Sequence, residues 1–296
     1  MTSPPRIIVC PFADTGLKIP DSGLEGAKLW MPAFAPKGHK LVYVDPFGTH
    51  DLATYEFDLA LGKAKNPYPL VSAGNDPNTL QICFPSVSPT IKSGENDDGK
   101  TWTVYHRGTP GSLDTRYGPG YLYLASVDTP GVEIRLANAN GDNYPFAAGD
   151  RDRGNNYEPT FAPQPSGGYM WVVFTSRRTY GTKLTGDKNS TKQLWVNAID
   201  LNPQPGKDPS HPAFWLGGQD SKDLNMRAYW ALDPCIQKGD SCKADSDCCD
   251  GSPCLDGKCG GPSTCVEVGE YCEEDADCCD PEARCFDNTC DYDMPN

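Results

Sequence analysis

Side chains that carry oxygen cluster in one loop rich in Asn and Asp. Asp150, Asp152, Asn156 and Glu158 lie two or four residues apart. Alternating oxygen ligands of this kind are typical of a Ca²⁺ loop, although Gly154 at the fifth position does not match an EF-hand. Asn and Asp are equally typical of a hydrated turn, which is the interpretation we favour. A Ca²⁺ site at these four residues is the alternative.

A second candidate site is cationic and aromatic. Arg177 and Arg178 end an expected strand, and Tyr180 follows closely. Loops that converge at one end of a repeat protein commonly bind ligands, so we predict that these three side chains contact one. A solvated strand end is the alternative interpretation.

Motifs for covalent or cofactor chemistry are absent from the sequence. It contains no GxSxG, GxGxxG, Walker or HExxH motif, and its four histidines are scattered. We expect each histidine to lie at a surface or strand edge. The sequence therefore predicts no catalytic residue.

Cysteines dominate the C-terminal end of the chain. Twelve of the 14 cysteines form one six-cysteine pattern written twice, with six, five, zero, four and four residues between them, and then six, five, zero, five and four. Neither copy contains a CxxC pair or a histidine, which argues against zinc and for disulfides. The cysteines are Cys235, Cys242, Cys248, Cys249, Cys254, Cys259, Cys265, Cys272, Cys278, Cys279, Cys285 and Cys290.

This spacing resembles the inhibitor-cystine-knot scaffold and equally the cysteine-rich Dickkopf-like modules. Six cysteines allow 15 pairings, so spacing alone does not fix the connectivity. The knot resemblance implies Cys235–Cys249, Cys242–Cys254 and Cys248–Cys259, then Cys265–Cys279, Cys272–Cys285 and Cys278–Cys290. The remaining two, Cys10 and Cys83, either pair with each other or are buried and free.

Disulfides persist in oxidising compartments, so we expect an extracellular, cell-surface or periplasmic protein. The N-terminus has no signal sequence, and we expect a targeting segment upstream. No stretch approaches the ~18 apolar residues of a membrane span.

The net charge of −14 is concentrated at one end of the chain. Residues 235–296 carry −12, and residues 265–296 account for −10 of it, so this end should repel nucleic acid. Solubility is the simplest role of this charge. Docking of a basic partner or of cations is the alternative.

Three segments of the body share one layout. They start at Met31, Phe84 and Glu158, and each has a proline, a small residue and a second proline before a turn. An alternating apolar run follows each turn, and this period of two predicts a strand. A second strand is expected to begin near Thr54 in the first segment, Tyr121 in the second and Gln193 in the third. The apolar faces are expected at Leu41 and Tyr43, at Trp102 and Val104, and at Met170, Val172 and Phe174.

Further pieces of the repeat are weaker. A fourth copy is expected to begin at residues 211–216 and to end at residues 226–233, and residues 6–10 could supply one more strand. The segments PAFAPKG and PTFAPQPSGG, with PSVSPT less closely, resemble the TolB-like, WD-type propeller repeat. The resemblance implies an all-β propeller with three to four blades present. A β-sandwich with long loops is the alternative fold.

The sequence thus predicts three domains: a propeller body at 1–233 and cysteine-rich modules at 234–262 and 263–296. The expected function is an exported, non-enzymatic binding or scaffolding protein, with a protein or carbohydrate ligand at the propeller face. One alternative is a propeller enzyme acting on polysaccharide, as a lyase or glycoside hydrolase. Another is a fragment of a larger adhesive protein.

Overall fold

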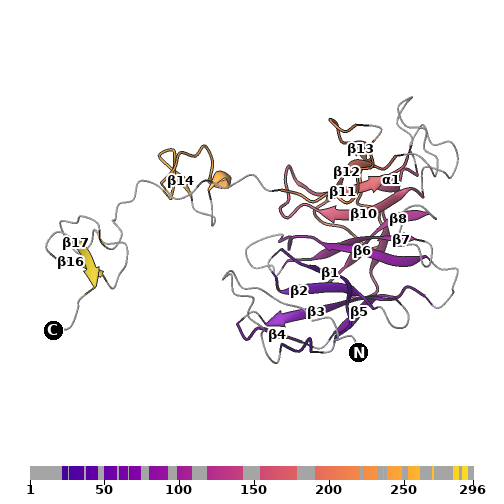
Figure 1. The fold of residues 1–296 in the computed structure, drawn as a ribbon, viewed down its shortest axis with the longest axis horizontal. Helices are drawn as coiled ribbons and strands as arrows, with labels where there is room; N and C mark the ends of the chain where they lie inside the picture. Colours follow the sequence, from indigo (N-terminus) through magenta and orange to yellow (C-terminus); the bar gives the residue numbers. More distant parts are fainter. Residues whose placement is uncertain are drawn as a thin grey trace. The chain divides into compact units, whose positions relative to one another are not determined.

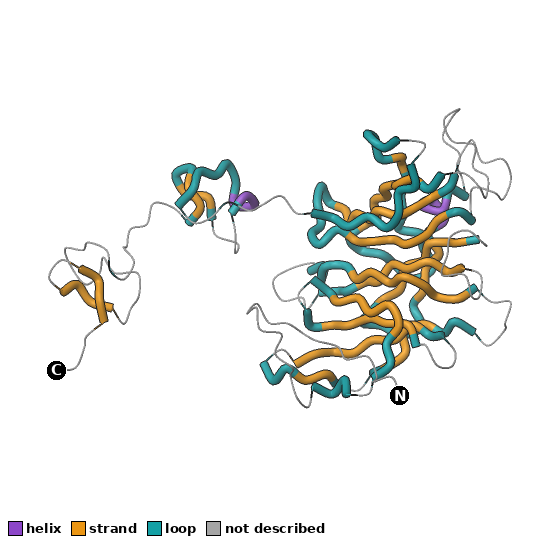
Figure 2. Tube along the Cα trace, viewed as in Figure 1, coloured by secondary structure: helices purple, strands orange, loops and turns teal. Residues whose placement is uncertain are grey.

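The computed structural model is all-β, with several antiparallel sheets, which confirms the all-β part of the expected fold class. Figures 1 and 2 show the strands and the loops that join them. The residues that the structure describes are 22–25, 27–36, 38–45, 50–58, 60–65, 67–74, 80–92, 99–108, 119–142, 154–178, 191–220, 223–231, 236, 239–248, 253–260, 269, 283–286 and 289–292.

The first sheet contains five strands. Its path runs from β1 (Trp30–Phe34) through β2 (Lys40–Val44) and β3 (Leu52–Asp58) to β4 (Lys63–Ala64), and β5 (Tyr68–Val71) also pairs with β3. All of these pairs are antiparallel.

The second and third sheets have four strands each, in sequence order. The second comprises β6 (Gln81–Val87), β7 (Trp102–Gly108), β8 (Gly120–Ser126) and β9 (Glu133–Arg135). The third comprises β10 (Asn156–Phe161), β11 (Tyr169–Ser176), β12 (Gln193–Asp200) and β13 (Phe214–Trp215). A short helix, α1 (Ala137–Asn140), follows β9.

The structure confirms the two strands predicted in each repeat and adds further strands to every sheet, so that the first sheet has five strands and the other two have four each. The proline-rich segments themselves form β1, β6 and β10, and each pairs with the next strand. The predicted fourth copy is wrong at its start, because β13 lies in the third sheet and pairs with β12. Residues 6–10 lie outside the described residues.

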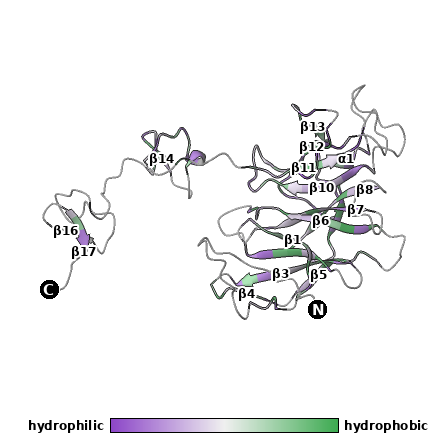
Figure 3. Ribbon diagram, viewed as in Figure 1, coloured by the Kyte–Doolittle hydropathy of each residue, from purple (hydrophilic) through white to green (hydrophobic). Residues whose placement is uncertain are grey.

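Apolar side chains fill the space between successive sheets. Val42 and Val44 of the first sheet pack with Tyr105 and Ala125 of the second. On its other face, the second sheet packs Trp102, Val104 and Leu122 against the third, including Met170, Val172, Phe174 and Trp195. Hydrophobic residues accordingly follow the strands in Figure 3. Burial on both faces explains why β2 and β7 are buried throughout, and not at alternate positions.

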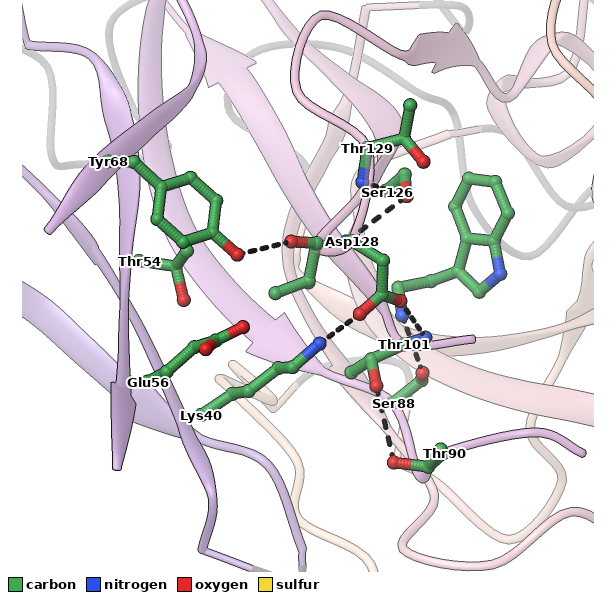
Figure 4. Close-up of polar contacts among 12 residues, drawn as sticks. Lys40, Thr54, Glu56, Tyr68, Ser88, Thr90, Thr101, Ser126, Asp128 and Thr129 are labelled. Atoms are coloured by element: carbon green, nitrogen blue, oxygen red, sulfur yellow. Dashed lines mark hydrogen bonds and ion pairs between the residues drawn. The ribbon is translucent and has the colours of Figure 1, made fainter. Parts of the chain in front are cut away.

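One ion pair joins the first sheet to the second. The ammonium group of Lys40 on β2 contacts the carboxylate of Asp128, which follows β8. The same carboxylate accepts a hydrogen bond of 2.6 Å from the main-chain N–H of Thr101, and the Tyr68 hydroxyl donates to the carbonyl of Val127 at 3.2 Å (Figure 4). Asp128, which follows the end of β8 in the second sheet, therefore also holds β2 of the first sheet in place.

A buried arginine makes a second connection between these sheets. The guanidinium of Arg107 donates to Glu133 within its own sheet at 2.8 Å. It also donates to the carbonyl oxygens of Ser72 at 3.0 Å and Leu80 at 3.3 Å, in the chain that leads from the first sheet to the second. Tyr105 donates its hydroxyl to the same Glu133 carboxylate.

The chain divides into two compact units, Met1–Trp230 and Ala231–Asn296. The second unit contains a 3-10 turn at Asp245–Asp247 and two short hairpins, β14 (Cys254–Leu255) with β15 (Lys258–Cys259), and β16 (Ala283–Phe286) with β17 (Thr289–Tyr292). Within the described residues, no helix is long and apolar enough to cross a membrane.

Disulfides hold the second unit. The structure joins Cys242 to Cys254 and Cys248 to Cys259, which are the second-to-fifth and third-to-sixth pairs of the knot pattern. Cys285 and Cys290 each take part in a disulfide as well. The thiol positions of Cys242, Cys248 and Cys259 lie close together, but their sulfurs are in disulfides and are not available to a metal.

We expect the body to fold without the cysteine-rich unit. A chain ending at residue 232 retains all three large sheets and their shared core. It should therefore keep its β-type circular dichroism and a single cooperative melt, measured against the full-length protein. Loss of the cooperative transition on truncation would contradict the boundary.

Candidate functional site

One backbone feature recurs at the start of each large sheet. The residue before the first proline of each repeat has a positive φ: 50° at Met31, 51° at Phe84 and 53° at Glu158. Such values are uncommon outside glycine, cost about 1–3 kcal/mol each, and concentrate at functional sites. We call these three the bulge residues.

Each bulge residue lies in a β-bulge of the same register. The pairing of β6 with β7 shifts between Cys83 and Ser86, so that Phe84 and its proline oppose Tyr105 alone. The same shift occurs in β1 and in β10. A bulge turns a side chain out of the regular pleat, which re-aims the bulge residue away from its own sheet.

The bulge residues connect to one another from sheet to sheet. The main-chain N–H of Phe84 donates to the sulfur of Met31 at 3.1 Å. The main-chain N–H of Glu158 donates to Nδ1 of His106 at 3.2 Å, and the imidazole of His106 stacks on the Phe84 ring with centroids 5.7 Å apart. Each of these two N–H groups is thus accepted by a side chain of the preceding repeat.

Arg227 continues this series. It precedes Ala228, and Trp230 stands three positions after it, as Phe34 and Phe161 do in the first and third copies. Its φ is 21°. Its main-chain N–H donates to the Glu158 carboxylate at 3.4 Å, as the Phe84 N–H does to Met31. The indole N–H of Trp230 donates to the carbonyl of Thr160 at 3.0 Å, so the segment around Arg227 lies beside β10. We call Met31, Phe84, His106, Glu158 and Arg227 the bulge cluster.

The guanidinium of Arg227 lies over two aromatic rings. Its central carbon is 5.1 Å from the Phe84 ring centroid and 5.3 Å from that of Tyr229, both within cation–π range. Its Nε is buried and has no hydrogen-bond acceptor, and no carboxylate of the described residues lies within ion-pair distance of it. The cation is therefore held by rings and has no anion among the described residues.

His106 is neutral in the folded protein. Its side chain is buried, and burial together with the nearby charge of Arg227 lowers its pKa to about 3. Because Nδ1 accepts the N–H of Glu158, the ring proton lies on Nε2. The prediction that the histidines lie at surfaces or edges is wrong for His106, which forms part of the cluster.

Glu158 is buried, but its carboxylate is only partly engaged. One oxygen, Oε2, accepts the Thr175 hydroxyl and the Arg227 N–H, each at 3.4 Å. The other, Oε1, accepts no hydrogen bond from the described residues. A carboxylate with spare acceptor capacity beside a cation without an anion can bind a polar ligand.

The sequence grouped Asn156 with Glu158, and the structure gives the two different partners. The side-chain oxygen of Asn156 accepts from the Ser176 hydroxyl at 3.0 Å and from the Arg178 guanidinium. Arg178 also donates to the carbonyl of Ala139 at 2.6 Å and lies 4.9 Å from the Trp195 ring centroid. This buried network joins β10 to α1 and holds no part of the bulge cluster.

Of the remaining predicted site residues, the structure describes Arg177 and Arg178, which have different surroundings. Arg177 is buried beside Tyr157 and Arg178 is buried in the Asn156 network. Asp150, Asp152 and Tyr180 lie outside the described residues, so the calcium site and the three-residue ligand contact remain predictions. Cys83 is free and buried, and burial raises the pKa of its thiol to about 12, so this thiol is unreactive.

Sequence reasoning missed four of the five cluster residues. The repeat carried a signal for Met31 and Phe84, because each precedes the first proline of its copy as Glu158 does, but it carried none for His106. The variable identity of the residue before that proline made the position look unimportant. Arg227 follows the same frame with alanine in the place of proline.

Comparisons with known proteins give no family. No protein-family model and no curated protein matches the chain. A similar solved structure is an endo-1,4-beta-xylanase from Bacteroides thetaiotaomicron, with 14% sequence identity and a TM-score of 0.34. The match covers 64% of this chain, which spans 57% of that one, and at this TM-score the likeness supports no conclusion about fold or activity.

Replacing Glu158 separates backbone strain from side-chain contacts. We expect Glu158→Gly to be more stable than Glu158→Ala by about 1 kcal/mol, because only glycine adopts a positive φ without strain. Urea unfolding of the two variants measures the difference. At Thr160, which lies in the same strand without a positive φ, the order should reverse. Equal stabilities at position 158 would contradict the strained bulge.

His106 should make the fold sensitive to acid. Its pKa is lower when folded than the unfolded value of about 6.5, so the unfolded chain binds the extra proton and stability falls as pH drops from 6.5 towards 3. The steepest loss from one such proton is roughly 1.4 kcal/mol per pH unit. His106→Asn, which keeps an acceptor for the Glu158 N–H, should flatten this part of the stability profile. An unchanged profile in that variant would show that other groups cause the acid sensitivity.

Proposed function

We propose that this chain is an exported binding protein whose body is built from β-propeller blades and whose ligand site is the bulge cluster. The observation that carries the proposal is the repeat of the strained bulge, which gathers side chains of different chemistry from successive sheets. Strain maintained at one repeated position is typical of a site kept for binding, because folding alone would favour glycine there.

The arrangement of the sheets supports the propeller interpretation. The second and third sheets are four-stranded meanders in sequence order, and the first strands are neighbours, with β6 contacting both β1 and β10. Stacking of successive four-stranded sheets through their faces is how propeller blades bury their apolar surfaces. The TolB-like motif at the start of each sheet agrees with this interpretation, and Arg227 repeats the position of the bulge residues in a segment, residues 223–231, that forms no strand.

The composition of the cluster favours binding over hydrolysis. Glycoside hydrolysis commonly uses two carboxylates on either side of the bond, and Glu158 is the only carboxylate among the five cluster residues. His106, with its lowered pKa, carries no charge near neutral pH and is a weak proton acceptor. An aromatic ring, a thioether, a cation and a carboxylate together suit recognition of a small polar molecule.

The disulfides of the C-terminal unit support export, because such bonds persist outside reducing compartments. We propose that the cysteine-rich unit is a pair of knot-like modules appended to the binding body. Their strong acidity would keep them soluble or would dock a basic partner.

A ligand panel tests the proposed function. At least one class of small molecule in a panel of neutral sugars, organic acids, amines and amino acids should raise the melting temperature of the wild-type protein. The gain should disappear in Glu158→Gln and in Arg227→Gln, and chromatography should recover the ligand unchanged after prolonged incubation. The surface pair Glu56 and Lys65, changed to Gln singly, supplies matched controls that should keep the gain.

Two outcomes would contradict this function. Conversion of a panel compound to product that depends on Glu158 would make the protein an enzyme. Binding that survives both cluster substitutions would place the ligand site elsewhere.

A further inference from the structure

The bulge cluster holds two opposite charges that are not paired with each other. The Arg227 main-chain N–H donates to the Glu158 carboxylate, while the Arg227 guanidinium lies over the rings of Phe84 and Tyr229. No ion pair joins the side chains of these two described residues. Both charges are partly removed from water. A charge that is removed from water without a compensating partner is costly.

We propose that this pair binds a zwitterion of the amino-acid type, with the ligand ammonium on the Glu158 carboxylate and its carboxylate on the Arg227 guanidinium. This inference rests on the proposed binding function and names the ligand class of that site. The free capacity is complementary: Oε1 of Glu158 accepts no hydrogen bond from the described residues, and the guanidinium of Arg227 has no anion there.

Charge balance favours a zwitterion over an anion or a cation. With His106 neutral, the cluster carries one positive and one negative charge. An anionic ligand at Arg227 would meet the Glu158 carboxylate nearby, and a cationic ligand at Glu158 would meet the guanidinium. A ligand with both charges satisfies both groups and leaves none unpaired.

The surroundings of Arg227 select for an apolar ligand side chain. Phe84 and Tyr229 flank the guanidinium, and the side chains of Met226 and Tyr229 are 58% and 70% exposed. Exposed aromatic and thioether surface next to charged groups suits contact with apolar groups of varied shape. L-phenylalanine is therefore a suitable probe.

Calorimetry at neutral pH with three matched compounds tests the proposal. L-phenylalanine carries both charges, N-acetyl-L-phenylalanine lacks the cation, and L-phenylalaninamide lacks the carboxylate. We expect L-phenylalanine to bind at least about tenfold more tightly than either analogue, because each analogue leaves one protein charge without its partner.

The variants should divide the two contacts. Glu158→Gln should weaken the binding of L-phenylalanine and of L-phenylalaninamide but leave the binding of N-acetyl-L-phenylalanine unchanged. Arg227→Gln should weaken the binding of N-acetyl-L-phenylalanine and leave that of L-phenylalaninamide unchanged. Arg227→Lys keeps the charge without the planar fork and should lie between wild type and Arg227→Gln. Unliganded melts identify any variant that fails to fold, and Glu56→Gln and Lys65→Gln should bind as wild type does.

Equal binding of all three compounds, or no binding of L-phenylalanine, would overturn the zwitterion proposal. If a neutral or singly charged panel compound binds and requires Glu158 or Arg227, the proposed binding function stands and the zwitterion is wrong. If no compound depends on the cluster, both are wrong.

Discussion

The strained bulge before each proline is the constraint on which the body depends. In β1, β6 and β10 two residues oppose one, and the extra residue takes a positive φ at Met31, Phe84 and Glu158. This geometry turns the N–H groups of Phe84 and Glu158 towards side chains of the preceding repeat. The first strands are thereby linked, and the side chains that could bind a ligand are brought together by the same contacts.

The strain is offset by burial on both sides of the second sheet. Its two faces pack into separate apolar clusters, one shared with the first sheet and one with the third. Each fully buried large apolar side chain contributes about 1.5–3 kcal/mol, so a few of them exceed the cost of three bulges. Ion pairs such as Lys40 with Asp128 add specificity to this stack, because they fix how one sheet meets the next.

The sequence predicted the strands whose apolar residues alternate, including those of β7, β8, β11 and β12. It did not predict β1, β6 and β10, because proline removes an N–H and a bulge breaks the alternation. The cluster was harder to find, since spacing along the chain says little about contacts across it. Glu158 was grouped with Asp150 by proximity in sequence, whereas its carboxylate contacts residues 17 and 69 positions away. Burial of His106 depends on stacking with Phe84, which no local pattern encodes.

The Glu158 N–H donates to a neutral His106 and so ties the second sheet to the third. Nuclear magnetic resonance can measure the scalar coupling that passes through an N–H···N hydrogen bond. We expect a coupling between the amide nitrogen of Glu158 and Nδ1 of His106, with the ring proton on Nε2. No coupling, together with an Nδ1 chemical shift showing that this nitrogen carries the proton, would contradict it.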